Sequence, residues 1–399
     1  MSTVLQVNIG TKGSTGTIAE SINRIALSNG WKAFFAYGRS VGQCESQLIH
    51  VGNKLSQAIA LLEARLFDCD GLSSRIATYK LVKKIKRIQP DIIHLHNLHG
   101  YYINYKILFE YLNSTDIIVI WTLHDCWSFT GHCAHFVGAK CNKWKTGCYH
   151  CPLKKSYPKS IGLDCSSRNY ILKKSLFTSN KNLHIITVSQ WLANFARQSF
   201  FKNNDIQVIH NGVNLKTFHP YHYKPSNKFR VIGVSSFWTK SKGLCDFFEL
   251  RKRLDRDKYD ITLIGMSEEQ IKELPEGIEG VRKTSSILEL ARYYAEADVF
   301  VNPTYADSFP TTNLESLACG TPVIIYNTGG CPEAVDENTG IIVEQGDINE
   351  LHKAVIFICQ QGKNYYSDDC RVRAEQYFNR DDRFADYMKL YIECLRRND

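Results

Sequence analysis

Two carboxylates and a glycine pair in the last third of the sequence have the types and spacing of a site for a ligand that carries both hydroxyl groups and phosphates. Asp307 and Glu315 stand eight residues apart, and Gly329 and Gly330 follow the apolar run Val323 to Tyr326. Carboxylates accept hydrogen bonds from hydroxyl groups, and N–H groups at a helix start or a glycine turn bind anions. We expect a helix whose start carries Asp307 and whose first turns carry Glu315, then a strand that leads into the glycine turn.

Two lysines precede this stretch. Lys240 and Lys242 stand between a predicted strand, Arg230 to Ser235, and a predicted helix, Leu244 to Leu254. Ammonium groups at such a junction reach a bound phosphate, although lysines in loops are more often only solvated.

A glycine-rich turn follows the first predicted strand, Val4 to Ile9, and carries Gly13 and Gly16 before a helix. Its spacing is not G-x-G-x-x-G, so it does not support a dinucleotide site. It is either a simple tight turn or a loop whose N–H groups approach a phosphate or a sugar ring.

Histidines end two further predicted strands. His94 and His96 belong to the segment that follows Pro90, and His124 follows the predicted strand Asp116 to Leu123. Open α/β sheets bind ligands at the carboxyl ends of their strands. A histidine there is often only a hydrogen-bonded cap, but two strands that end alike favour a cleft.

A cysteine-rich segment, residues 126–158, interrupts the alternation of strands and helices. Its cysteines have the spacing C-x7-C-x6-C-x2-C, at Cys133, Cys141, Cys148 and Cys151. Four thiols in a loop with few apolar residues favour a structural zinc site over free thiols or a disulfide pair. His132, His135 or His150 could replace one of them, and the spacing matches no ferredoxin cluster.

Length and composition indicate a globular chain of two domains. Its 399 residues are more than one typical hydrophobic core contains. Of these residues 44% are hydrophobic and 22% are charged, as is usual for a globular protein. No apolar run approaches the ~20 residues of a membrane span, and the amino terminus has no signal-peptide pattern, so we expect a cytoplasmic protein. The polar segment Pro220 to Asn227 marks the expected domain boundary.

The formal net charge is +9, and part of it is concentrated in residues 78–89. This segment is either an ordinary amphipathic surface helix or a patch that contacts anionic lipid head groups at the inner face of the plasma membrane. No nucleic-acid-binding motif accompanies the charge, so we expect no nucleic-acid partner.

Taken together, these motifs resemble those of the retaining glycosyltransferases of family 4, over the whole chain. The resemblance rests on D-x7-E at Asp307 and Glu315, A-C-G-T-P-V at 318–323, G-G-x-x-E at 329–333, K-G at 242–243, N-G-V-N at 211–214 and H-D at 124–125. The cysteine segment looks like that of a bacterial exopolysaccharide subgroup, which includes colanic-acid-type enzymes.

The resemblance implies an α/β protein of the GT-B fold: two Rossmann-like domains with parallel sheets face each other across a cleft, and a C-terminal helix crosses back to the first domain. The corresponding ranges are an acceptor-side domain at 1–212 with the cysteine-rich insertion 126–158, a nucleotide-sugar domain at 213–380, and the final helix at 381–399.

The family's functional residues carry over by motif. Glu315 should accept from ribose hydroxyls, Lys242 should pair with the donor diphosphate, and Asp307 should hold the transferred sugar. His124 should lie beside the reactive face of that sugar, so the implied catalytic residues are His124, Asp307 and Lys242. The implied donor-binding residues are Gly13, Gly16, Lys240, Lys242, Asp307, Phe309, Asn313, Leu314, Glu315, Gly329 and Gly330.

The sequence departs from the family pattern at two places. The first acidic position is usually Glu and is Asp307 here, and Ser235, Ser236 and Phe237 occupy the region in which the family has an Arg. Lys240 could supply the second positive charge, as a point charge and not as a bidentate fork.

The resemblance implies transfer of a sugar, with retention of configuration, from a UDP- or GDP-sugar to a glycan or lipid-linked acceptor in bacterial surface polysaccharide synthesis. No catalytic metal is expected if the protein itself supplies the charge that stabilises the leaving diphosphate. The alternatives are a nucleotide-sugar-binding assembly protein without turnover and a basic, zinc-bearing nucleic-acid-binding protein. An NAD-dependent epimerase is disfavoured by the missing dinucleotide fingerprint.

Overall fold

The computed structural model describes residues 1–221 and 226–398. The chain forms two compact units: unit 1 comprises Met1–Ile209 and the C-terminal segment from Phe384, and unit 2 comprises His210–Arg383. The chain thus leaves unit 1 three residues before the expected limit at 212 and ahead of the polar segment 220–227. Of that segment, residues 222–225 lie outside the described residues.

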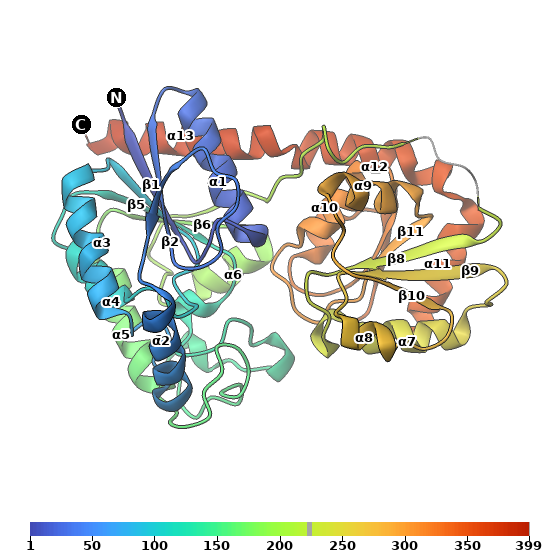
Figure 1. The fold of residues 1–399 in the computed structure, drawn as a ribbon, viewed down its shortest axis with the longest axis horizontal. Helices are drawn as coiled ribbons and strands as arrows, with labels where there is room; N and C mark the ends of the chain where they lie inside the picture. Colours follow the sequence, from blue (N-terminus) through green and yellow to red (C-terminus); the bar gives the residue numbers. More distant parts are fainter. Residues whose placement is uncertain (222–225, 399) are drawn as a thin grey trace. The chain divides into compact units, whose positions relative to one another are not determined.

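Unit 1 is built on a seven-stranded parallel sheet with the strand order β3-β2-β1-β4-β5-β6-β7 (Figure 1). The inner strands are buried on both faces, as expected of a parallel sheet covered by helices on both sides. The strands are β1 (Thr3–Asn8), β2 (Lys32–Tyr37), β3 (Gln47–His50), β4 (Ile92–Leu95), β5 (Ile118–Leu123), β6 (Leu183–Thr187) and β7 (Ile206–Val208).

The helices of unit 1 follow the strands in the βαβ pattern. They are α1 (Gly13–Ser28), α2 (Lys54–Phe67), α3 (Arg75–Ile88), α4 (Tyr105–Leu112), α5 (Ser166–Thr178) and α6 (Gln190–Gln198). On one face of the sheet, Trp121 of β5 packs against Phe109 of α4 and Phe177 of α5. Residues 126–158 form no strand and only three short 3-10 turns, η1 (Trp127–Phe129), η2 (Val137–Ala139) and η3 (Lys143–Lys145).

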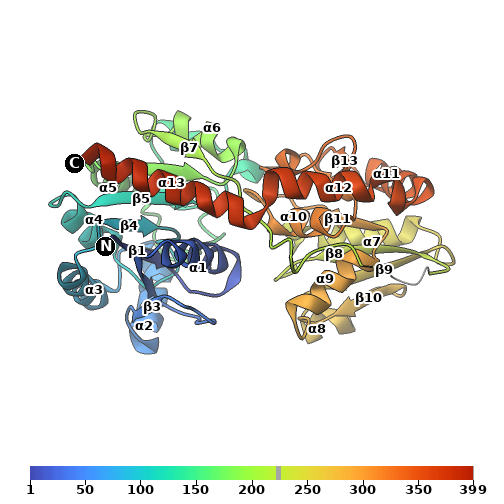
Figure 2. The ribbon, with the colours of Figure 1, turned by 90° about the horizontal axis from the view of Figure 1, so that it is seen from above.

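The final helix, α13 (Arg380–Asn398), packs on unit 1 (Figure 2). Its apolar side, with Phe384, Tyr387 and Tyr391, shares one buried cluster with Ile18 of α1 and Ile92 of β4. Helix α13 therefore covers the sheet built from the first half of the chain, as the expected fold requires.

Unit 2 contains a six-stranded parallel sheet with the order β10-β9-β8-β11-β12-β13. Its strands are β8 (Phe229–Val234), β9 (Tyr259–Ile264), β10 (Ile278–Val281), β11 (Val299–Asn302), β12 (Val323–Tyr326) and β13 (Gly340–Val343). Its helices are α7 (Leu244–Arg253), α8 (Glu268–Lys272), α9 (Ile287–Glu296), α10 (Thr311–Ala318), α11 (Ile348–Gln361) and α12 (Lys363–Phe378). Two parallel sheets with covering helices confirm the predicted fold class.

No helix among the described residues is long and apolar enough to cross a membrane.

Candidate functional site

A short 3-10 turn, η4 (Lys240–Lys242), presents the two predicted lysines after β8. Gly243 ends this turn with a φ of +76°, and a Cβ there would lie 2.3 Å from the carbonyl oxygen of Pro303. Only glycine permits both the positive φ and this close approach. The turn is thereby held against the loop after β11, where Tyr305 N–H donates to the Ser241 carbonyl at 2.8 Å.

Lys242 and Asp307 form an ion pair in this loop, with 2.6 Å between Nζ and Oδ2. Both side chains are partly exposed, at 34% and 24%. Burial acts to lower the pKa of Lys242, but the charge and hydrogen bond of Asp307 outweigh it and raise the pKa. Lys242 is therefore positively charged at neutral pH, whereas Lys240 of the same turn is exposed.

The glycine pair after β12 packs directly on the backbone of Asp307. Gly329 has a φ of +61°, and a Cβ at this position would lie 1.7 Å from the Asp307 carbonyl oxygen. The N–H of Gly330 donates to that oxygen at 3.3 Å. The two motifs, about 20 residues apart in the sequence, are thus one structural unit around Asp307.

The prediction that Asp307 lies at the start of a helix is wrong. Helix α10 begins at Thr311, and Asp307 lies in the preceding loop. Pro310 takes the N-cap position, and a residue before proline is biased away from the helical conformation, so Phe309 cannot easily extend the helix backward. Glu315 does lie within α10, as expected.

The Glu315 carboxylate accepts a hydrogen bond from Tyr294 Oη at 3.1 Å. Burial raises the pKa of Glu315 to about 7, although hydrogen bonds from Tyr294 and Thr311 act to lower it. The carboxyl is thus close to half protonated at neutral pH, which makes its capacity to accept from hydroxyl groups dependent on pH.

Three predicted donor-binding side chains lie in the interior of unit 2. Leu314 and Asn313 are fully buried, and the Asn313 amide oxygen accepts from Asn302. The Phe309 ring packs on His210, and the Phe309 carbonyl accepts from Asn211 of the N-G-V-N motif at 2.9 Å. These buried side chains shape the loop and the helix that carry the donor motif.

In unit 1, Gly13 and Gly16 of the glycine-rich turn have different roles. Gly13 begins α1 with a φ of +79°, and a Cβ there would meet no atom within 4 Å, so the backbone faces open space. Gly16 is buried, and a Cβ there would lie 2.6 Å from the Gly10 carbonyl oxygen. Gly13 is therefore placed to approach a ligand, whereas Gly16 lets the helix pack on the loop.

His124 is the outer end of a buried hydrogen-bonded chain. Its Nε2 lies 2.9 Å from Nδ1 of His96, and Nε2 of His96 lies 2.8 Å from Oε1 of Gln6. The Gln6 amide in turn donates to Tyr391 Oη, which lies 2.6 Å from Nδ1 of His94. This series of hydrogen bonds connects the end of β5 to the final helix α13.

The order of donors and acceptors sets the tautomer of His124. The Gln6 oxygen can only accept, so His96 donates from Nε2. Burial lowers the pKa of His96 well below its usual value, so the ring is neutral and its Nδ1 accepts from Nε2–H of His124. Burial also lowers the pKa of His124 to about 4. His124 is thus neutral, with Nδ1 left as a hydrogen-bond acceptor.

We expect His96→Phe to lower kcat/KM about fivefold to tenfold, because His124 loses the acceptor that holds its tautomer. His96→Asn should retain most activity, since its amide oxygen can take the place of Nδ1. The ¹⁵N shifts of the His124 ring should report protonated Nε2 in wild type and His96→Asn and a tautomer mixture in His96→Phe. An unchanged ring spectrum in His96→Phe would contradict this assignment.

A second buried cluster surrounds the H-D aspartate. Nε2 of His99 donates to Asp125 Oδ2 at 2.8 Å, and its Nδ1 lies 2.7 Å from Tyr157 Oη. Burial acts to raise the pKa of Asp125, but the charge and bond of His99 outweigh it and lower the pKa to about 2. The buried Lys173 donates to the carbonyls of Trp127 and Thr130. Together these groups fasten the cysteine-rich segment to the end of β5.

Sequence reasoning missed Gln6, Tyr157, Lys173 and Tyr391. None belongs to a motif, and Tyr391 lies 385 residues from Gln6, its hydrogen-bond partner. His94 and His96 were visible as polar groups near a strand end, but the hydrogen bonds that connect them were not.

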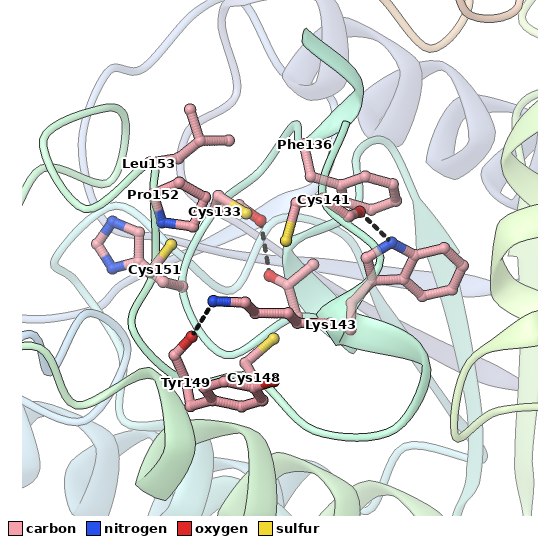
Figure 3. A pocket seen from close by; sticks show the side chains of 12 residues that line it. Cys133, Phe136, Cys141, Lys143, Cys148, Tyr149, Cys151, Pro152 and Leu153 are labelled. Atoms are coloured by element: carbon pink, nitrogen blue, oxygen red, sulfur yellow. Dashed lines mark hydrogen bonds between the residues drawn. The ribbon is translucent and has the colours of Figure 1, made fainter. Parts of the chain in front are cut away.

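The four predicted zinc ligands, Cys133, Cys141, Cys148 and Cys151, line one pocket of the insertion (Figure 3). The N–H of Gly131 donates to the Cys148 sulfur at 3.2 Å. Within residues 1–221 and 226–398, however, no group of three or more His, Cys, Asp or Glu side chains is arranged to hold a metal ion. The arrangement of the thiols therefore does not support zinc, which stays a prediction for metal analysis of the purified chain.

Comparison with known proteins assigns this arrangement of motifs to a family. Residues 57–217 match the family described as Glycosyltransferase Family 4, and residues 228–361 match the family described as Glycosyl transferases group 1. This chain is a glycosyltransferase of the family 4 type. The glycosyltransferase is 26% identical over 372 residues to the putative colanic acid biosynthesis glycosyl transferase WcaC of Escherichia coli K12, covering 87% of this chain and 89% of WcaC.

Solved structures share the fold of the glycosyltransferase. Sucrose-phosphate synthase from Thermosynechococcus elongatus superposes with a TM-score of 0.77 at 17% identity, over 100% of both chains. The Anabaena protein HepE, in complex with UDP, superposes with a TM-score of 0.68 at 15% identity, over 98% of this chain and 100% of that one. Both support the GT-B assignment of the two sheets.

Proposed function

We propose that this glycosyltransferase moves a sugar from a UDP- or GDP-sugar to a glycan or lipid-linked acceptor, with retention of anomeric configuration, in bacterial surface polysaccharide synthesis. The observation that carries the proposal is the charged Lys242–Asp307 pair, with the Gly329-Gly330 turn packed on the Asp307 backbone. The similarity to WcaC, whose name refers to colanic acid biosynthesis, supports the polysaccharide context.

Breaking the bond between the sugar and the diphosphate leaves negative charge on the departing phosphate. Lys242, with Lys240 nearby and N–H groups at the glycine turns, would stabilise that charge. Asp307, once released from Lys242 by the diphosphate, would accept from hydroxyls of the transferred sugar. The departing phosphate itself would take the proton of the acceptor hydroxyl, so no side chain has to act as the base.

Glu315 and His124 have positioning tasks in this mechanism. Glu315 would accept from ribose hydroxyls when it is ionised. His124 is neutral because burial lowers its pKa to about 4. Its Nδ1 would accept a hydrogen bond from a sugar hydroxyl. The enzyme would work in the cytoplasm or at the inner face of the plasma membrane, where nucleotide sugars are available.

Thermal-shift measurements with a panel of UDP- and GDP-sugars test the donor, because a ligand that binds only the folded state raises the apparent stability. The selected donor, labelled in the sugar, is then incubated with lipid-linked and glycan acceptors, and NMR of the product gives the anomeric configuration. Retained configuration is expected. Inversion would overturn the mechanism, and binding without transfer or hydrolysis would favour an assembly protein that has lost turnover.

A further inference from the structure

Phe237 is an aromatic side chain that unit 2 leaves in water beside the donor loop. It lies between β8 and η4, shortly before Lys242, and it is 73% exposed. The next residue, Trp238, is only 3% exposed and packs edge-on against Phe247 of α7, with 5.5 Å between the ring centroids. The fold thus buries one of two adjacent aromatic residues and leaves the ring of the other uncovered.

Hydrogen bonds on both sides of Phe237 fix the path of its loop. The Ser235 hydroxyl donates to the Phe237 carbonyl at 3.0 Å, and Nε1 of Trp238 donates to the Ile264 carbonyl at 2.9 Å. The Trp238 carbonyl accepts from the Gln270 side chain at 3.0 Å. The ring is therefore presented by a fixed loop, and a ligand that covers it does not have to order the backbone first.

A glycine at the end of β9 lets this loop lie where it does. Gly265 has a φ of +90°, and a Cβ there would lie 1.7 Å from the Ser235 carbonyl oxygen. A residue with a side chain could not occupy this position without moving the loop. The loop that carries Phe237 is thus packed on the end of β9.

The strand order places Phe237 and the sugar-binding groups on opposite sides of Lys242. Strand β8, which leads to Lys242, lies between β9 and β11 in the sheet. Asp307 follows β11 and Gly329 follows β12, whereas the loop of Phe237 lies against β9. A line along this edge of the sheet therefore meets Phe237, then Lys242, then Asp307 and Gly329.

A nucleotide sugar has its diphosphate between the nucleoside and the sugar. If the proposed function holds, with the sugar at Asp307 and the diphosphate at Lys242, the nucleoside extends toward β9. Glu315, the expected ribose residue, agrees with this direction, because its partner Tyr294 belongs to α9, the helix that connects β10 to β11. The base then lies beyond the ribose, on the side of Phe237.

We propose that Phe237 is the surface on which the donor nucleobase stacks. Every nucleobase has a π-face, and aromatic side chains stack on all of them. Stacking reads no hydrogen-bonding edge of the base, so Phe237 contributes affinity for both UDP- and GDP-sugars, with a larger contribution for the larger purine ring. The region Ser235 to Phe237, which departs from the family pattern, thus supplies a ring where the family has a charge.

Isothermal titration of the full chain with UDP, GDP and inorganic pyrophosphate tests the proposal. Wild type should bind both nucleotides more tightly than pyrophosphate. Phe237→Ala should bind UDP and GDP about tenfold more weakly, which is within the usual effect of removing an aromatic ring from under a base, and the loss should be larger for GDP. Its affinity for pyrophosphate and its melting temperature should stay close to wild type, because the deleted ring is exposed.

Further variants separate stacking from a general apolar contact. Phe237→Trp should retain nucleotide affinity because it keeps a flat ring, whereas Phe237→Leu should lose most of what Phe237→Ala loses. Lys242→Ala should weaken pyrophosphate binding as well as nucleotide binding. The matched control is Phe357→Ala on α11, where the ring is 51% exposed; it should bind all three ligands as wild type does.

The proposal is overturned if Phe237→Ala binds UDP and GDP with wild-type affinity; a loss of transfer in that case would assign the ring to the acceptor. It is also overturned if Phe237→Ala weakens pyrophosphate as much as the nucleotides, or if Phe357→Ala has the same effect. Nucleotide binding that depends on Phe237, without sugar transfer, would reject the proposed function alone. Transfer with nucleotide affinity unchanged in Phe237→Ala would reject the stacking alone, and a wild type that binds neither nucleotide would reject both.

Discussion

Lys242→Ala should lower kcat by about a hundredfold to a thousandfold, the usual effect of removing one well-placed group that stabilises developing negative charge. Lys242 is the lysine that the fold holds in place, through the Gly243 turn and the 2.6 Å bond to Asp307. Donor turnover is measured by release of the nucleoside diphosphate under saturating donor.

The matched control is Lys240→Ala, from the same 3-10 turn. Lys240 is exposed, so its charge is screened by water and its loss should reduce kcat by no more than about tenfold. Both variants should melt close to wild type, since the Asp307 carboxylate left by Lys242→Ala is 24% exposed and remains hydrated. Equal losses in the two variants, or normal turnover in Lys242→Ala, would refute the assignment of the leaving-group site.

Glu315→Gln should weaken donor binding by about tenfold to a hundredfold, the cost of losing hydrogen bonds to a charged acceptor. The pH dependence is more specific. With a pKa of about 7, the carboxyl is mostly protonated below neutral pH and mostly ionised above it. Wild-type donor affinity should therefore rise between about pH 6 and about pH 8, whereas Glu315→Gln should show no such rise.

Stability should show the opposite trend for the same group. The unfolded carboxyl has a pKa near 4.5 and the folded one about 7, so the folded state binds more protons between these values and loses stability as pH rises through them. Glu315→Gln should accordingly gain in melting temperature relative to wild type as pH increases from about 5 to about 8. A constant difference between the two proteins across this range would show that burial does not raise this pKa.

The local patterns of the chain predicted most of its regular structure and the chemistry of the donor loop. Alternating strands and helices were visible because the parallel strands consist mostly of apolar residues and most of the helices are amphipathic. Strands β2, β9 and β12 begin and end where expected. The short or partly exposed strands β3, β10 and β13 carry too few buried residues to produce such a pattern. The types of Lys242, Asp307 and Glu315, and their order around glycine turns, were sufficient to indicate a ligand with phosphates and hydroxyls.

Only the tertiary structure determined which of these groups interact. The pairing of Lys242 with Asp307, and the packing of Gly329 on the Asp307 backbone, join segments far apart in the chain. The tautomer of His124 depends on Gln6 at one end of the sequence and Tyr391 at the other. Residue types determine which chemistry is available. The burial of each side chain and its hydrogen-bond partners depend on the tertiary structure, and they determine its charge and its orientation.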